Sequence, residues 1–223
     1  MLTAAELERE IGASNVDSGI NVRWIMPEGM FEFPVDAEDL DETAERLVEL
    51  ARTVMPEASF EMQLEWALMV AAHYDSFIEA GVQYSGFVIT DVEGARCTAT
   101  VTVCLSDLDE SAGLRPVGFI GSAMRHLDIG QVSEIELPCG PAVSCIGTRK
   151  ADLDGSLTLS GQGEPVWTSF IQVQVPLGNG TLLTLEMSTP NREGWDVFSS
   201  MFAGVVKSVR FFDDAGNPMV MPG

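Results

Sequence analysis

The sequence predicts an α+β fold, in which helices flank a mainly antiparallel sheet on both faces. Apolar residues recur at every second position along segments of the second half of the chain, which is the period of a strand. Residues 36–55, 58–80 and 191–208 instead show the three- and four-residue spacing of helices. Short turns join consecutive strands, whereas parallel neighbours need crossovers of about a dozen residues or more. The sheet is therefore mainly antiparallel, and the helices cover its faces.

The chain is expected to form one α+β domain over residues 21–212. Residues 1–20 are predicted to be an arm or a short helix, and residues 213–223 a flexible tail. The domain begins with two short strands in Asn21–Val35, separated by a turn at Pro27-Glu28-Gly29.

Two helices are predicted next. Asp36 is the expected N-cap of the first, which Pro56 ends. The second helix is expected from about Ala58 to Ala80, with Gly81 after it, and its middle is apolar on nearly every side. Such a helix must be covered all round, either between the sheet and the first helix or by a partner.

The remaining elements follow the same two periods. A hairpin is predicted over 82–103 with its turn at 91–94, and a short helix is one interpretation of the glycine-rich segment 112–127. The other predicted elements are strands at 132–137, 142–148, 167–175 and 181–187, a helix at 191–208 and a strand at 209–212.

Composition excludes several classes of partner. The 223 residues include 34 Asp+Glu against 12 Lys+Arg, for a net charge of −22, and 46% are hydrophobic, which is typical of a globular chain. Only two lysines are present, so neither nucleic acid nor an anionic membrane is an expected partner. The first residues lack the apolar core of a signal peptide, and no apolar run is long enough to span a bilayer. A cytoplasmic location is expected.

No catalytic motif is recognisable. Neither a metal site nor a cofactor is expected, because the four cysteines lack a C-x-x-C pair and no phosphate-binding loop is present. The cysteines are interpreted as small buried thiols. An enzyme would have to use His73 or His126 with nearby carboxylates.

Two groups of residues are candidates for contact with a partner protein. The first is the acidic face of the first helix, which is interpreted either as a solvated face or as a docking surface for a basic partner. The second is an apolar set on the second helix, which is interpreted either as core or as interface anchors. The candidates are Glu38, Asp41, Glu42, Glu45 and Glu49 on the first helix and Met62, Trp66 and Met69 on the second.

The order of elements resembles a known group. The chain is similar to actinobacterial proteins of the Mog1/PsbP-like fold in the order of its elements. These elements are the sequence around Trp24 to Phe31, two helices, the strand with Tyr84, the strand ending Leu185-Glu186-Met187-Ser188-Thr189-Pro190, and the helix with Trp195 and Phe198-x-x-Met201-Phe202. The resemblance covers about residues 20–212. It implies a non-enzymatic binding or assembly role, in a group whose genes often lie near specialised secretion systems. It carries over no ligand residue.

Three functions are therefore weighed. The first is a non-catalytic protein-interaction module, such as an adaptor, a chaperone, an assembly factor or a toxin-neutralising protein. The second is an enzyme that uses His73 or His126. The third is a self-associating structural protein, most simply a homodimer formed through a sheet edge or the second helix.

Overall fold

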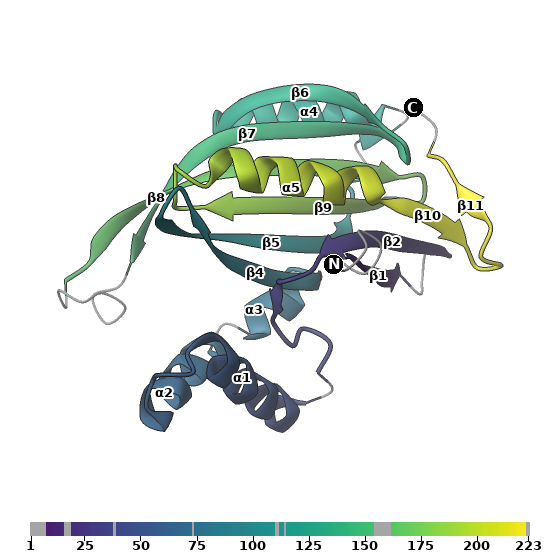
Figure 1. Ribbon diagram of the computed structural model, residues 1–223. Coiled ribbons are helices and arrows are strands. Elements are labelled where there is room, and N and C mark those ends of the chain that lie inside the picture. The colour runs from purple at the N-terminus through teal and green to yellow at the C-terminus, as the bar shows by residue number, and fades with distance from the viewer. Residues whose placement is uncertain are drawn as a thin grey trace, which may run out of the picture.

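Two antiparallel sheets and five helices make up the part of the chain that the structure, a computed structural model, describes (Figure 1). The described residues are 8–15, 19–37, 39–72, 74–109, 112–113, 115–153 and 162–221. The strands are β1 (Glu8–Asn15), β2 (Ile20–Pro27), β3 (Phe31–Glu32), β4 (Val82–Val92), β5 (Ala95–Asp107), β6 (Gly130–Leu137), β7 (Gly140–Leu153), β8 (Glu164–Leu177), β9 (Thr181–Thr189), β10 (Arg210–Asp213) and β11 (Pro218–Met219). The helices are α1 (Leu40–Val54), α2 (Phe60–Ala71), α3 (Tyr74–Glu79), α4 (Pro116–Leu127) and α5 (Trp195–Ser208).

The larger sheet has seven strands in the order β3-β4-β5-β9-β8-β7-β6. Every neighbouring pair is antiparallel. The strands that the two-residue period predicts are all present, and several are longer than predicted, such as β8 with 14 residues. The segment 112–127 resolves into α4, with Pro116 in its first turn, where a missing N–H costs nothing.

The smaller sheet joins the two ends of the described chain. Its order is β1-β2-β10-β11, so β2 pairs with its neighbour β1 on one side and with β10 on the other. The expectation of an arm or a helix before residue 21 is wrong for residues 8–15, which form β1. The expected tail is likewise partly ordered, because β11 pairs with β10 and Met221 is buried. Neither segment has a clear two-residue period, and cross-strand pairing alone makes them strands.

Helices cover both faces of the seven-stranded sheet, as the sequence predicts. On one face, α5 and β2 pack against β5, β8 and β9 around a large core that includes Trp24, Phe198 and Phe202. On the other face, α4 covers β6, β7 and β8 through Ile120 and Met124. The two helices lie on opposite sides in Figure 1.

The predicted helix boundaries need correction. Asp39, not Asp36, caps α1, because its side chain accepts a hydrogen bond from the Glu42 N–H (2.9 Å). The segment predicted as the second helix instead forms two helices, α2 and α3, and both end before Gly81. None of the described helices is long and apolar enough to cross a membrane.

Candidate functional site

The helical pair α1–α2 stands below the edge of the seven-stranded sheet formed by β3 and β4 (Figure 1). The two helices pack against each other through small and medium side chains, with Thr43, Leu47 and Ala51 buried on α1 and Gln63 and Ala67 buried on α2. Gln63 also donates hydrogen bonds from Nε2 to the carbonyl oxygens of Met55 (2.9 Å) and Ala58 (3.3 Å). These contacts fix α2 to the loop that follows α1.

Several large apolar side chains of α2 lie on its exposed side. Residues four apart share a helix face, so Phe60, Leu64 and Leu68 form one row, and these residues are 57%, 37% and 59% exposed. Glu61 and Glu65 form the next row. Beyond it lies Met62, which is 58% exposed, and Met69, seven residues further on, is half-buried. The exposed side of α2 is thus a row of carboxylates between two apolar rows, and we call these residues the α2 surface.

One border of the α2 surface is an aromatic cluster that joins α2 to the sheet. Phe33 stacks on Trp66 with ring centroids 6.4 Å apart, and Phe87 lies 5.3 Å from Phe33 and 6.5 Å from Trp66. Phe31 and Phe77 extend the cluster. Trp66 is half-buried in this cluster, where its ring packs against Phe33 and Phe87.

The other border is α1. The Arg52 guanidinium lies 5.9 Å from the Phe60 ring centroid and forms an ion pair with Glu49 (3.1 Å). Arg46 is likewise neutralised by Asp36 (2.8 Å) and Glu42 (3.4 Å). Both arginines of α1 are therefore already paired with carboxylates.

The acidic residues predicted on the first helix fall into three groups. Asp41 and Glu45 are exposed on α1, whereas Glu42 and Glu49 form the ion pairs just described. Glu38 lies outside the described residues. The spacing of these acids does place them on the solvent side of α1, away from the buried stripe of Leu47 and Ala51.

The charge of this region is strongly negative. Residues 39–80 contain 10 Asp+Glu and 2 Arg, which gives −8 within the total of −22. Such a field attracts basic segments and speeds their association at low salt.

Of the apolar residues predicted as interface anchors on this helix, Met62 is exposed, whereas Trp66 and Met69 are half-buried. The prediction did not name Phe60, Leu64 and Leu68, although the middle of this helix is mostly apolar. What the sequence does not show is which side the neighbouring helix covers. Here α1 covers the side with Gln63 and Ala67 and leaves the larger side chains exposed.

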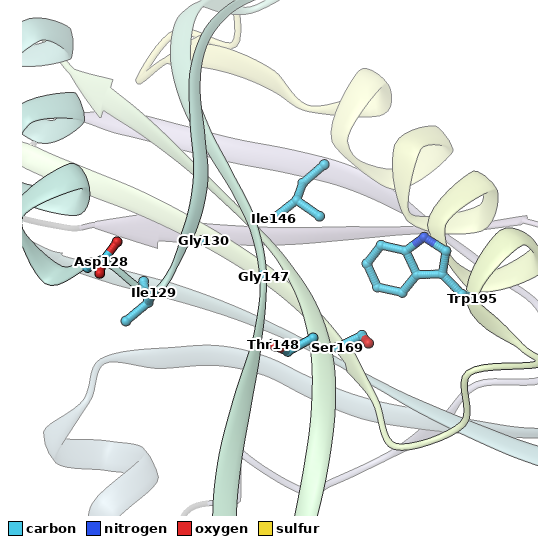
Figure 2. A pocket seen from close by; sticks show the side chains of 8 residues that line it. All are labelled: Asp128, Ile129, Gly130, Ile146, Gly147, Thr148, Ser169 and Trp195. Atoms are coloured by element: carbon cyan, nitrogen blue, oxygen red, sulfur yellow. The ribbon is translucent and has the colours of Figure 1, made fainter.

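A separate pocket of about 490 Å³ lies between the start of α5 and strands β6–β8. Figure 2 shows the Trp195 indole on α5 at one side of the lining residues, Asp128 and Ile129 at the other, and the Ile146 side chain between them. A Cβ on Gly147 would lie 2.1 Å from the Ile129 carbonyl oxygen, so only glycine allows the close approach of the two strands here. The pocket is open, and among the described residues that line it Asp128 supplies the one carboxylate.

A smaller, polar pocket of about 270 Å³ lies where β1, β3, β4 and α1 meet. Two ion pairs line it, Arg9–Glu32 (2.7 Å) and Arg46–Asp36 (2.8 Å), so its charges balance. The Tyr84 hydroxyl is buried beside it without a hydrogen-bond partner among the described residues. Burial, with a further contribution from the nearby Glu32 carboxylate, raises the pKa of Tyr84, which keeps the phenol neutral.

The histidines do not form a catalytic site in the described part of the chain. His126 lies exposed on the last turn of α4 and makes no ion pair with a described residue, and His73 lies outside the described residues. Within residues 8–221, leaving out the undescribed positions, no group of three or more His, Cys, Asp or Glu side chains could hold a metal ion. All four cysteines are free thiols.

Comparisons with known proteins add one likeness. No protein-family model matches the chain, and no curated protein matches it. Among solved structures, the chain is similar to the solution structure of cyanobacterial PsbP (CyanoP) from Synechocystis sp. PCC 6803, with 11% identity, a TM-score of 0.41 and 91% of each chain covered. What the molecule's own architecture establishes is the class: an α+β protein whose antiparallel sheets carry helices on both faces.

Proposed function

We propose that this chain is a non-catalytic protein-interaction module that binds a basic, amphipathic helical segment of a partner along the α2 surface. One observation carries the proposal: Phe60, Met62, Leu64 and Leu68 of α2 are 37–59% exposed, whereas α1 packs against the side with Gln63 and Ala67. Exposed apolar side chains gathered on one face are typical of a site that another molecule covers.

The chemistry of the partner follows from the three rows. Two apolar rows accept apolar side chains, and the carboxylates of Glu61 and Glu65 between them accept hydrogen bonds from lysine or arginine. The surrounding charge of −8 favours the same kind of segment. An adaptor, a chaperone or an assembly factor, including one that serves a secretion system or neutralises a toxin, would use such a surface.

We place this activity in the cytoplasm. The four cysteines remain free thiols, which fits a reducing compartment.

Titration with a defined probe tests the proposal. The probe is a fluorescent peptide of about 18 residues in which leucine and lysine alternate with helical spacing, so that one face is apolar and its flanks are basic. Leu64→Ser combined with Leu68→Ser should weaken binding about tenfold or more, because apolar anchors dominate such interfaces. Glu61→Lys combined with Glu65→Lys should weaken it most at about 50 mM NaCl and least at about 500 mM.

Two controls make the test specific. Val197→Ser alters a 48% exposed apolar residue on α5 and should leave binding unchanged. A peptide with glutamate in place of lysine should not bind. Equal binding of the peptide by the wild type and the leucine variants would overturn the proposal. A dimer of the wild-type protein in light scattering that is absent in the leucine variants would also overturn it, because a second copy would then occupy the α2 surface.

A further inference from the structure

The outer edge of β6 is a second interaction surface, independent of the α2 surface. β6 is the last strand of the seven-stranded sheet and pairs only with β7 among the described residues (Figure 1). All eight of its residues pair in unbroken register, from Gly130 with Gly147 to Leu137 with Gly140. The far side of such a strand presents a row of backbone N–H and C=O groups that an added strand can pair with.

This edge has only one of the devices that usually block such pairing, the charged side chains of Glu134 and Glu136. Edges are normally protected by short strands, charged side chains (lysine above all), proline or a β-bulge. The opposite edge of the same sheet follows that rule, because β3 has two residues and Pro34 follows it closely. β6 has eight residues, contains neither lysine nor proline, and has no bulge in its register.

The side chains of β6 define what an added strand would meet. Glu134 and Glu136 are exposed on the face that α4 covers, where Arg125 reaches Glu134 at 3.5 Å. The other face carries Ile135 and Leu137, half-buried against the main core. A strand paired with β6 would therefore need basic residues on one face and apolar residues on the other, alternating along its length.

A second copy of this chain fits the edge poorly. In a symmetric antiparallel pairing of two β6 strands, residues directly opposite each other must lie on the same face of the joined sheet. A pairing centred on Glu134 places that residue opposite its own copy, and one centred on Ile135 places Glu134 opposite Glu136 twice. A pairing centred on Ser133 places Glu134 opposite Val132 and Glu136 opposite Gly130, so neither glutamate gains a partner of opposite charge. Like charges directly opposite are destabilising, and each copy carries −22.

We infer that β6 binds an extended segment of another protein by strand addition, and that this segment alternates basic and apolar residues. Backbone hydrogen bonds to β6 supply affinity, and lysine or arginine opposite Glu134 and Glu136 sets the register.

A peptide as long as β6, with lysine and valine alternating, is the probe. We expect it to bind the full-length protein in fluorescence anisotropy and to slow hydrogen exchange at alternate amides of β6 by about tenfold or more, because only outward-facing amides gain partners. Glu134→Lys combined with Glu136→Lys should weaken binding about tenfold or more. The same peptide with two adjacent prolines at its centre keeps its charge but cannot pair, and should lose binding.

The α2 surface supplies the matched control. Glu61→Lys combined with Glu65→Lys makes the same change of charge at two exposed glutamates of α2 and should leave binding of the extended peptide unchanged. Unchanged binding in the β6 variant, equal binding of the proline peptide, or no slowing of exchange within residues 130–137 would each overturn the inference. Because the helical and extended probes respond to different variants, failure at one surface does not imply failure at the other.

Discussion

The Cys139 thiol illustrates how burial tunes a single residue. Cys139 is 1% exposed within the main core, and burial raises the pKa of its thiol to about 11. In an unfolded chain the same group loses its proton near its ordinary pKa of 9.0. Between these values the folded protein holds a proton that the unfolded chain releases, so the stability that this residue confers falls as the pH rises.

We therefore predict that the free energy of unfolding falls between about pH 9 and 11, with Cys139 contributing on the order of 2 kcal/mol. Urea unfolding at about pH 7.5, 9.5 and 10.5 measures the fall. In Cys139→Ala the fall should be smaller by this contribution, so the wild-type and variant curves should converge at high pH. Parallel curves would show that Cys139 does not keep its proton in the folded protein.

Single residues also show where sequence reasoning stops. Asp36 and Asp39 both precede an amphipathic run, and the sequence alone favours Asp36 as the helix cap. In the structure Asp39 caps α1, while Asp36 forms an ion pair with Arg46, ten residues away. Several acids near a helix start can each act as the cap, and the path of the chain entering the helix decides between them.

At the scale of elements, the junction between α3 and β4 depends on one glycine. Gly81 has φ +66°, and its carbonyl oxygen accepts a hydrogen bond from the Leu105 N–H at 2.9 Å. A Cβ here would lie 2.0 Å from the Leu105 carbonyl oxygen. Both the backbone conformation and the contact with β5 therefore require glycine.

Gly81→Ala should lower the free energy of unfolding by about 3 kcal/mol, because the left-handed conformation and the clash with β5 both contribute. Gly94→Ala is the control, since Gly94 has φ +85° at the β4–β5 turn but nothing lies within 4 Å of its Cβ position. That substitution should cost about 1 kcal/mol from conformation alone. Equal costs in urea unfolding would contradict the role given to the contact with Leu105.

The elements with a strong period were predictable, and those without one were not. The alternation in 167–175 and 181–187 predicted β8 and β9, because each strand has one face in the core. β1 and β11 have no such pattern. The exposure of Leu64 and Leu68 was also unpredictable, because periodicity identifies an apolar helix but not the number of neighbours that cover it.

At the scale of the whole molecule, net charge opposes folding. The net charge is −22, and the ion pairs described above lie at exposed or half-buried positions, where each contributes little. We expect the thermal midpoint to rise by about 2–4 °C when NaCl is raised from about 20 to 500 mM, because screening weakens the repulsion between carboxylates.

Circular dichroism at several NaCl concentrations measures this rise. Glu61→Lys combined with Glu65→Lys changes the net charge from −22 to −18 and should reduce the rise. A midpoint that falls with salt would mean that the ion pairs outweigh the repulsion.

The position of β2 has a consequence for how the protein is made. The Ile25 N–H donates to Ser208 Oγ at 2.8 Å across a separation of 183 residues, and β10 borders β2 along its free side. On a ribosome, β1 and β2 emerge well before α5 and β10, so one edge of β2 and its Trp24 face stay unoccupied until those elements have been made. Nascent chains in this state are prone to aggregate, so we expect early segments of this protein to need shielding until α5 and β10 have been synthesised.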